Sequence, residues 1–396
     1  MGKVLELINH EFDCECGRTH YVPIREINTG EGALSPTGFE RILGGKRALM
    51  LCDYHTKSAV NDRLAEDLRE HGWKLKVREF QSERLKNDDA VVGTVVLDTE
   101  PGMDGIVAVG GGTVTDLGRF VASRLGKPFI LVMTCPSMDG YASNVAAVAV
   151  DGRRKIFKDC RYPDAIFGDM AVIGGAPFDL IKSGFGDMLG KRTALPDWAL
   201  SRRMTGEYFC ERAAALMDES SMNCVLNLNG LISRDARAIA ALTDALVMTG
   251  VCMALVSDTR PASGSEHIFS HFMVESALDS GSFISHGVSV GFGTLISTLL
   301  YRYLLEELHP AELESITDEL LKYLLPPEQV WDLLTNSRIT ADIEGYLSGE
   351  AIAEMIRRCA APDKRYTILR YLSDCGHLEN GIRYTSDALG KIAGQR

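Results

Sequence analysis

The chain has 396 residues, of which 45% are hydrophobic and 24% are charged. This length is enough for more than one hydrophobic core, so we expect two domains. The formal net charge of -12 argues against nucleic-acid and anionic-membrane partners, because an acidic surface repels phosphate groups. A local basic pocket on such a protein can still bind a small anionic substrate.

The N-terminal segment MGKVLELINHEF contains acidic residues and no apolar core, so we expect no signal peptide. We also expect no membrane-spanning segment, since none matches the roughly 18–20 apolar residues that such a helix needs. Most of the ten cysteines stand alone, which is typical of reduced thiols in a cytoplasmic protein. Cys14, Cys16 and His20 are clustered. We interpret them as part of a solvent-facing hairpin and not as a zinc site, because a second pair of ligands is missing.

Strands and helices alternate in the first half of the chain. Short apolar runs bounded by polar residues predict strands, and helical periodicity that ends at glycine predicts helices. The predicted strands are 47–53, 73–80, 105–112 and 127–134, and the predicted helices are 55–72 and 113–126. This alternation predicts a parallel, doubly wound sheet.

From about residue 174 onward the patterns are helical, and no convincing strand separates them. The segment IGGAP at 173–177 therefore marks the boundary that we predict between the two domains. Residues 1–172 are expected to form an α/β domain that binds a dinucleotide. Residues 173–396 are expected to form an all-helical domain that binds a metal and a substrate.

Three consecutive glycines, Gly110, Gly111 and Gly112, lie where a predicted strand leads into a helix. Glycine lets the backbone approach a phosphate closely, and a helix N-terminus offers free N–H groups and positive dipole charge. A diphosphate would fit there. The pattern differs from the dinucleotide motif G-x-G-x-x-G, and an ordinary tight turn explains the glycines equally well.

Polar residues also follow two neighbouring predicted strands. Asp53 ends one of them, where a carboxylate can accept a hydrogen bond from a ribose hydroxyl or can cap the next helix. TCPSMDGYAS, residues 134–143, follows another. Its hydroxyl groups suit a nucleotide, and Asp139 suits a sugar or substrate hydroxyl.

The segment RPASGSEHIFSHF, residues 260–272, places His267 and His271 four residues apart on one helix face. Ser263 and Glu266 match a capping box, so we predict that the helix begins there. The spacing resembles that of a zinc-binding H-E-x-x-H helix. A metalloprotease is disfavoured because Ile268 occupies the position of the general base.

Two further residues complete a candidate metal site. His286 opens a second predicted helix, and Asp187 lies in the helical pattern SGFGDMLGK. One carboxylate and two imidazoles suit Zn²⁺ or a similar divalent ion and leave a coordination position open for substrate. Each histidine alone could equally be a hydrogen-bonded core residue, and periodicity does not show that the three meet in space.

The strings GGGTVTD, PSMDGYAS, SGFGDMLGK, RPASGSEHIFSHF and SHG, in this order, make the chain similar to a known family. It resembles the glycerol-1-phosphate dehydrogenase branch of the superfamily that also holds iron-containing alcohol dehydrogenases, glycerol dehydrogenases and dehydroquinate synthases. The resemblance covers about residues 45–300. It implies a Rossmann-like N-terminal domain and a helical C-terminal domain.

Residue roles are carried over from the family by motif. Asp187, His267 and His286 would bind the metal, and Asp187 would also face the substrate. His271 would contact the substrate or relay a proton, and Asp139 would contact the substrate. The implied dinucleotide contacts are Asp53, Gly110, Gly111, Gly112, Thr113, Val114, Thr115, Asp116, Thr134, Cys135, Pro136, Ser137 and Ser143. Arg260 is our own choice for the substrate phosphate, made from its position before the histidine helix.

The resemblance implies a cytoplasmic, homo-oligomeric enzyme of phospholipid metabolism. It would interconvert dihydroxyacetone phosphate and sn-glycerol 1-phosphate with NAD(H) or NADP(H) and one divalent metal. Zn²⁺ is the first candidate for this metal, and Ni²⁺ or Fe²⁺ are the others. Asp53 favours NAD, since a carboxylate repels a 2′-phosphate. The alternatives are a glycerol-type dehydrogenase of an uncharged polyol, a dehydroquinate synthase-like lyase and a non-catalytic relative. The lyase is disfavoured because SMDGYASNV replaces that enzyme's S-S-V-G-G-K-T type loop.

Overall fold

The structure, a computed structural model, describes residues 1–82, 84–361 and 365–394. They form two compact units. Unit 1 contains Met1–Asp13, Thr19–Ile181 and Leu242–Leu255, and unit 2 contains Cys14–Arg18, Lys182–Ala241 and Val256–Arg396. Along the chain the change of unit therefore falls after Ile181, later than the boundary that the sequence predicts.

Helix α11 (Ala236–Val256) also departs from the predicted division, because most of it belongs to unit 1. Its Gly250 explains this packing. A Cβ atom at Gly250 would lie 2.7 Å from the Cβ atom of Ala142, so the helix backbone lies directly against the loop 134–143. The apolar pattern of the helix shows that it is buried and does not show which core it joins.

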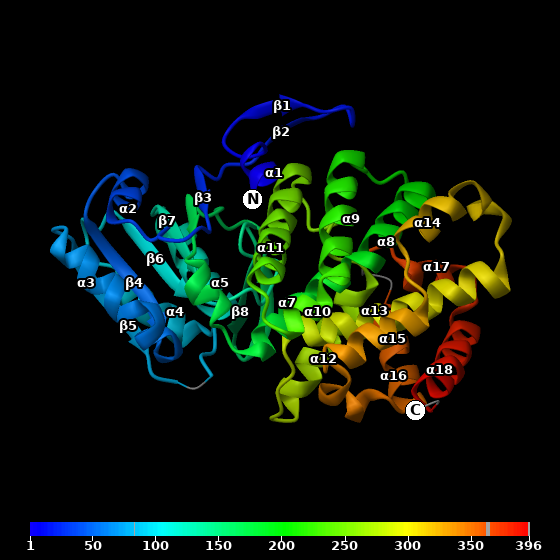
Figure 1. Cartoon of the computed structure of the whole chain (residues 1–396). Helices are drawn as coiled ribbons and strands as arrows, with labels where there is room; N and C mark the ends of the chain where they lie inside the picture. Colours follow the sequence, from blue (N-terminus) through cyan, green and yellow to red (C-terminus); the bar gives the residue numbers. More distant parts are fainter. Residues whose placement is uncertain (83, 362–364, 395–396) are drawn as a thin grey trace. The chain divides into compact units, whose positions relative to one another are not determined.

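Unit 1 is built on a six-stranded sheet in the order β3-β10-β7-β6-β4-β5, and every neighbouring pair is parallel (Figure 1). The strands are β3 (Glu26–Asn28), β4 (Arg47–Asp53), β5 (Lys74–Phe80), β6 (Gly105–Gly110), β7 (Phe129–Met133) and β10 (Ala165–Phe167). The sequence predicts β4 to β7. It misses β3 and β10, because three residues are too few to show a period.

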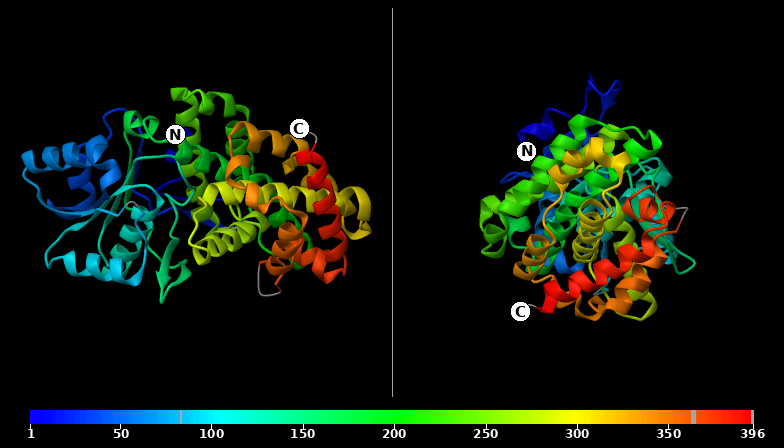
Figure 2. Two further views of the ribbon diagram at one scale, coloured as in Figure 1. Left: turned by 90° about the horizontal axis from the view of Figure 1, so that it is seen from below. Right: turned by 90° about the vertical axis from the view of Figure 1, so that its right-hand side faces the viewer.

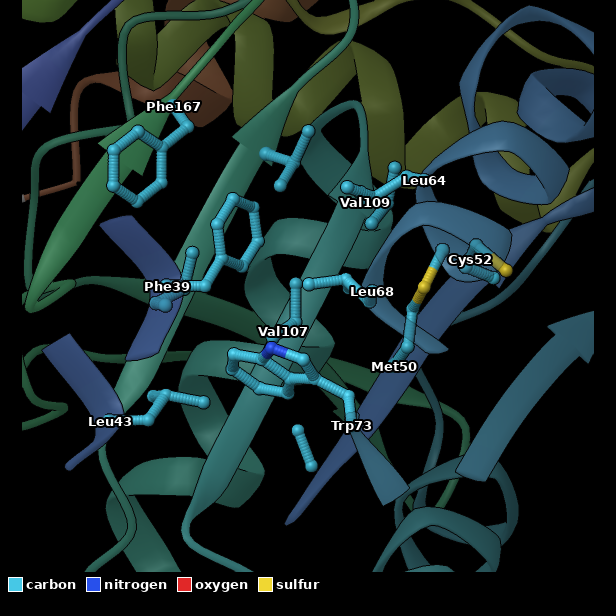
Figure 3. Close-up of a cluster of buried hydrophobic side chains, with 14 of the residues drawn as sticks. Phe39, Leu43, Met50, Cys52, Leu64, Leu68, Trp73, Val107, Val109 and Phe167 are labelled. Atoms are coloured by element: carbon cyan, nitrogen blue, oxygen red, sulfur yellow. The ribbon is translucent and has the colours of Figure 1, made fainter. Parts of the chain in front are cut away.

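Helices cover both faces of this sheet, which confirms the predicted doubly wound fold. On one face, α2 (Pro36–Leu43) and α3 (Asp62–Glu70) pack on alternate strand residues such as Met50, Val107 and Phe167 (Figure 3). On the other face lies α5 (Gly112–Leu125). A Cβ atom at Gly118 of α5 would lie 2.8 Å from the Cβ atom of Ala108, so this helix packs with its backbone close to β6.

The predicted helix 55–72 is shorter than expected. A 3₁₀ turn (Tyr54–Thr56) and a π-helical turn (Lys57–Asn61) precede α3. Side-chain hydrogen bonds explain this start. The Asp53 carboxylate accepts from the Thr56 N–H at 3.2 Å, and the Asn61 side chain donates to the Asp53 carbonyl at 2.8 Å. Such local bonds compete with the regular helical pattern.

Two hairpins and three further helices complete the described part of the first 174 residues. The hairpins are β1 (Glu11–Asp13) with β2 (Thr19–Tyr21), and β8 (Ala146–Val150) with β9 (Arg153–Phe157). The second turns at Asp151 and Gly152, which both have positive φ, as a two-residue hairpin loop requires. The helices include α1 (Gly2–Leu5), α4 (Asp89–Asp98) and α6 (Met170–Gly174).

No strand occurs after β10 in the part of the chain that the structure describes, which confirms the predicted change to helices (Figure 2). The longer helices are α7 (Phe178–Leu189), α8 (Lys191–Thr205), α9 (Glu211–Leu226), α12 (Ser265–Asp279), α13 (His286–Arg302), α15 (Pro327–Asn336), α16 (Gly349–Cys359) and α18 (Leu378–Gly394). Shorter ones are α10 (Leu228–Ile232), α14 (Thr317–Tyr323) and α17 (Ile368–Asp374).

The prediction that no segment is long and apolar enough to span a membrane is wrong. Two segments, Ala236–Val256 and His286–Leu308, are long and apolar enough to cross a membrane by length and composition. Their most apolar windows are 83% and 89% buried inside the protein, so these segments serve as core helices of the fold. The alternating small and large apolar residues that fill a dense core give the same pattern as a membrane span.

Candidate functional site

The carboxyl ends of three neighbouring strands bring the first group of predicted residues together in unit 1. Cys52 of β4 pairs with Val109 of β6, and Gly110 pairs with Met133 of β7. The residues that follow these strands therefore share one sheet edge, called here the carboxyl edge. From β4 the chain moves outward to β5 and then returns to β6 on the other side of β4. Open α/β sheets bind ligands at such a switch point.

The glycine loop at this edge packs tightly against the loop after β7. Gly111 is the N-cap of α5, and Gly112 is its first residue. A Cβ atom at Gly111 would lie 3.1 Å from the Cys135 sulfur, and one at Gly112 would lie 2.8 Å from the Met138 sulfur. The missing side chains thus let the loop after β7 pack directly against the start of α5. The role of this helix N-terminus toward a phosphate group stays a prediction.

Asp116 has a different environment from the other residues of the glycine stretch. Its buried carboxylate pairs with Arg119 at 3.0 Å and accepts from the Ala147 N–H at 3.1 Å. Burial raises the pKa of Asp116, and the charge of Arg119 opposes this shift. Arg119 also donates to the carbonyls of Gly140, Tyr141 and Val145. These contacts show that Asp116 helps to fix the loop 140–147, and its predicted contact with a dinucleotide has no support among them.

Other residues of the carboxyl edge are held by local hydrogen bonds. The Ser137 hydroxyl lies 3.0 Å from that of Tyr141, and the Ser143 hydroxyl donates to the Gly140 carbonyl at 3.0 Å. Asp53 caps the following helical turn, as one of its two predicted roles requires. Asp139 is buried in the same loop. The roles of these residues toward a dinucleotide or a substrate stay predictions.

Unit 2 brings Asp187, His267 and His286 together, from α7, α12 and α13. The Nε2 atom of His267 lies 3.7 Å from Asp187 Oδ1, and that of His286 lies 3.9 Å from Asp187 Oδ2. One donor atom from each residue lies within 4.8 Å of the others. Three protein ligands of this kind suit a divalent ion with one position left open. We call these residues the Asp-His-His centre.

Glycines allow the three helices to approach closely enough for this convergence. A Cβ atom at Gly287 would lie 1.7 Å from the Ser183 carbonyl oxygen of α7. One at Gly186 would lie 2.2 Å from the Gly287 carbonyl oxygen, and one at Gly293 would lie 2.5 Å from the Glu266 carbonyl oxygen of α12. Gly186 and Gly287 are the sequence neighbours of Asp187 and His286. Close packing of the helix backbones therefore fixes the Cα positions of these two candidate ligands.

Outer partners orient the histidines of the centre. The Nδ1–H group of His267 donates to the Glu266 carboxylate at 2.8 Å, which leaves the Nε2 lone pair for a metal. Glu266 also accepts from the Gly264 N–H at 2.6 Å and from the Thr193 hydroxyl at 3.0 Å. Burial is the largest influence on the pKa of Glu266 and raises it, but the bond to His267, the charge of that ring and backbone N–H groups together lower the pKa. The Ser270 hydroxyl lies 3.3 Å from Nδ1 of His286.

The Asp187 carboxylate is balanced by a buried cation. Lys191 Nζ donates to Asp187 Oδ1 at 3.1 Å and to the Ala262 carbonyl at 3.0 Å, and both charged side chains are fully buried. An unpaired buried carboxylate is costly, so the ion pair with Lys191 offsets the cost of burying Asp187. A carboxylate beside two imidazoles is a donor set that fits Zn²⁺, Ni²⁺ or Fe²⁺.

Two predicted residues lie beside this centre with different environments. His271 is exposed, and its ring centroid lies 6.4 Å from that of His267. Arg260 is buried and paired with Glu207, to which its Nε donates at 2.7 Å, and it also donates to the Tyr366 carbonyl. Its Nη1 atom is buried without a hydrogen-bond partner among the described residues. Arg260 therefore has a structural partner, and its role toward a phosphate stays a prediction.

The predicted capping box of the histidine helix is wrong. Helix α12 begins at Ser265 with Gly264 as its N-cap, and the Ser263 carbonyl accepts from Arg365. Glu266 does bond the N-cap N–H group, but its carboxylate also holds His267. Sequence analysis missed the roles of Glu266, Lys191 and Arg119. The adjacent residues Glu266-His267 and the i, i+4 pair Asp187-Lys191 were the available signals.

The comparisons with known proteins agree with this geometry. Residues 29–177 match the family model described as iron-containing alcohol dehydrogenase. Solved structures with the same fold include glycerol dehydrogenase from Schizosaccharomyces pombe, with TM-score 0.68 and 16% identity over 94% of this chain and 91% of that one. An iron-containing alcohol dehydrogenase from Thermotoga maritima has TM-score 0.66 and 17% identity over 94% and 99%. The fold is thus that of the iron-containing alcohol dehydrogenases.

Curated relatives are more specific than the fold. Glycerol-1-phosphate dehydrogenase [NAD(P)+] from Bacillus licheniformis is 31% identical over 298 residues, which cover 74% of each chain. The enzyme of the same name from Sulfolobus acidocaldarius is 35% identical over 68% of this chain and 70% of its own. The chain belongs to the glycerol-1-phosphate dehydrogenase family.

Proposed function

We propose that this protein is an NAD(P)-dependent glycerol-1-phosphate dehydrogenase that interconverts dihydroxyacetone phosphate and sn-glycerol 1-phosphate. The observation that carries the proposal is the convergence of Asp187, His267 and His286 within 4.8 Å in a chain of this family. Both the order of the motifs and the names of the relatives support it. The substrate would be a small phosphorylated triose or polyol.

In this proposal the Asp-His-His centre holds one divalent ion. Bound there, the ion would supply Lewis-acid polarisation of the substrate carbonyl, a contribution of several kcal/mol. Asp187 supplies the anionic ligand, and Glu266 holds the His267 ring so that Nε2 faces the ion. Lys191 offsets the charge of Asp187 and holds its carboxylate in place. Zn²⁺ is our first choice, and Ni²⁺ or Fe²⁺ would also fit the donor set.

The carboxyl edge of unit 1 is the proposed site of NAD(P)(H), which supplies or accepts the hydride. Gly111 and Gly112 leave room for the diphosphate at the N-terminus of α5. The loop with Thr134 and Ser137 lies beside them. Asp53 at the tip of β4 would accept from a ribose hydroxyl and disfavour a 2′-phosphate, so we propose a preference for NAD.

Two further residues are proposed to handle protons and substrate hydroxyl groups. His271 is exposed, so its imidazole can exchange a proton with solvent and relay it to the oxygen of the carbonyl group whose carbon accepts the hydride. Asp139 would accept a hydrogen bond from a substrate hydroxyl. We also propose that the enzyme is a cytoplasmic homo-oligomer and serves phospholipid metabolism.

One observation favours a second candidate function. Arg260 is paired with Glu207, so the cation chosen for the substrate phosphate is already neutralised. A glycerol-type dehydrogenase of an uncharged polyol needs no such cation. If that alternative holds, the substrate carries no phosphate, and the site needs no other cation in place of Arg260.

The two candidates are separated by one assay. NADH oxidation is followed with dihydroxyacetone phosphate and, separately, with dihydroxyacetone, each with and without a chelator. We expect a chelator-sensitive rate with the phosphate alone. Equal rates with both ketones would favour the glycerol-type function, and a rate that survives complete metal removal would contradict the metal-dependent mechanism.

A further inference from the structure

A second cluster of metal-binding residue types lies at the tip of the N-terminal hairpin. Cys14 and Cys16 lie in the turn between β1 and β2, and His20 lies on β2. Cys210, the N-cap of α9, joins them from a distant part of the chain. One donor atom from each of the four residues lies within 4.8 Å of the others. The proposed function uses none of these residues.

The hairpin turn places its two cysteines side by side. The Gly17 N–H group donates to the Cys14 carbonyl at 2.9 Å, and the Cys14 N–H group donates to the Arg18 carbonyl at 3.1 Å. Gly17 has φ of 83°, a left-handed conformation that glycine adopts without strain. This tight turn lets residues that are only two apart in sequence serve the same site.

The distance between sulfur atoms fits a shared metal ion. The Cys14 and Cys210 sulfurs, both in unit 2, lie 4.0 Å apart. Two thiolates bound tetrahedrally to Zn²⁺, each at about 2.3 Å, are separated by about 3.8 Å. A disulfide requires about 2.05 Å, and none of the ten cysteines forms one. The cluster thus has the spacing of ligands around a cation.

Outer contacts orient the ligands as they do in known metal sites. His20 is buried, and its Nδ1–H group donates to the Leu255 carbonyl at 2.6 Å. The carbonyl can only accept, so this bond fixes the tautomer in which Nε2 carries the lone pair. The Tyr208 hydroxyl lies 3.1 Å from the Cys16 sulfur, and the Arg18 guanidinium lies 3.3 Å from the Tyr208 ring centroid. These contacts hold the Cys16 side chain and the ring of Tyr208 in fixed positions beside the cluster.

We propose that Cys14, Cys16, Cys210 and His20 bind one structural Zn²⁺ ion. Three thiolates and one imidazole are soft and borderline ligands, which select Zn²⁺ over Mg²⁺ or Ca²⁺. Four protein ligands close the tetrahedral shell and leave no position for substrate, so the role is to fix the hairpin turn to the start of α9. The sequence shows Cys14, Cys16 and His20 together but does not show the fourth ligand, because Cys210 lies far away in the chain.

Cobalt substitution tests this site directly in the full-length protein. Protein stripped of metal under reducing conditions is titrated with Co²⁺, which gives sulfur-to-cobalt charge-transfer absorption only where thiolates bind it. The Asp-His-His centre has no sulfur ligand, so this absorption reports the cysteine site alone. We expect the band in the wild type and in His286→Ala, and its loss in Cys210→Ser and in Cys16→Ser. Cys375→Ser is the matched control, since Cys375 is exposed and lies outside the cluster.

Metal content gives a second measurement that does not depend on activity. Compared with the wild type after Zn²⁺ loading and dialysis, Cys210→Ser and His286→Ala should each retain one equivalent fewer, and the double variant two fewer. The proposal is overturned if reduced wild-type protein shows no sulfur-to-cobalt band. It is also overturned if Cys16→Ser and Cys210→Ser both keep the band and the full zinc content. Neither result would affect the proposed dehydrogenase function.

Discussion

The Asp-His-His centre and the carboxyl edge depend on the sequence in different ways. Each loop of the carboxyl edge comes directly after a strand in the chain. A dinucleotide at this edge would mainly require space beside a helix N-terminus. The Asp-His-His centre needs three side chains from three helices, and buried partners such as Glu266 and Lys191 hold two of them. Changes at the centre should therefore cost stability and metal together, whereas changes at the edge should affect the dinucleotide alone.

The largest effect is expected for Asp187→Ala. This change removes a metal ligand and leaves Lys191 buried without its counter-charge, which costs about 3–5 kcal/mol. Urea unfolding of metal-free protein measures the loss of stability, and elemental analysis measures the metal. His286→Ala is the control, because it should lose the metal with a much smaller loss of stability. Equal stability of the two metal-free variants would contradict the role of Lys191.

Gly287→Ala should be nearly as damaging, although it changes no ligand. The new Cβ atom would meet the Ser183 carbonyl oxygen at 1.7 Å, so α13 must move away from α7. We expect a loss of about 1–3 kcal/mol in unfolding free energy, together with weaker metal binding. Gly390→Ala in α18 is the control, since no atom lies within 4 Å of its added Cβ. Unchanged metal affinity in Gly287→Ala would show that helix spacing does not set the centre.

Glu266→Gln tests the outer partner of His267. The amide keeps the size of the carboxylate but accepts a weaker hydrogen bond, so metal affinity should fall about 10–100-fold. Competition with a chromophoric chelator measures this affinity. Glu275→Gln on the exposed face of the same helix should leave it unchanged. Wild-type affinity in Glu266→Gln would mean that His267 needs no carboxylate partner.

Gly112→Ala should separate the two regions. Its Cβ atom would lie 2.8 Å from the sulfur of Met138, a flexible side chain that can move into the space at the helix N-terminus. We expect about a tenfold higher KM for NADH, which corresponds to about 1.4 kcal/mol, with full metal content. Gly93→Ala in α4, where the added Cβ meets no atom within 4 Å, should behave as the wild type. A loss of metal in Gly112→Ala would show that the carboxyl edge and the Asp-His-His centre do not respond independently to substitution.

Asp53→Asn should have the smallest effect. Asparagine can still cap the turn at Thr56, but the repulsion of a 2′-phosphate is lost, a contribution of about 1 kcal/mol in solvent. The ratio of kcat/KM for NADH to that for NADPH should therefore fall several-fold. Asp62→Asn, at the start of α3, is the control. An unchanged ratio would remove Asp53 from cofactor selection.

Much of the fold could be predicted from the sequence because its patterns are local. The strands β4 to β7 and helix α5 each carry their own apolar pattern, and glycines mark the ends of β6 and α5. The strands β3 and β10 were missed because they owe their pairing to neighbours in the sheet. Most of helix α11 belongs to unit 1 and not to the predicted helical domain. The apolar pattern of a buried helix does not show which core the helix packs in.

The candidate site was predicted less completely, for the same physical reason. Periodicity placed His267 and His271 on one face but could not distinguish a buried ring from an exposed one. The resemblance separated them, and the structure places His286 and Asp187 beside His267. Arg260 was chosen by position alone, and its partner Glu207 lies far away in the chain, in the loop between α8 and α9. Cys210 could not be linked to Cys14 without the fold.

The pair of Asp187 and Lys191 has a consequence for how the protein meets its ion. Because the ammonium group already pairs with the carboxylate, the metal-free chain does not bury Asp187 as an unpaired charge, and the ligands can stay in position. Uptake and release of the ion can then proceed on the folded protein. The fraction of metal-loaded protein would then change with the concentration of the ion, while the protein stays folded.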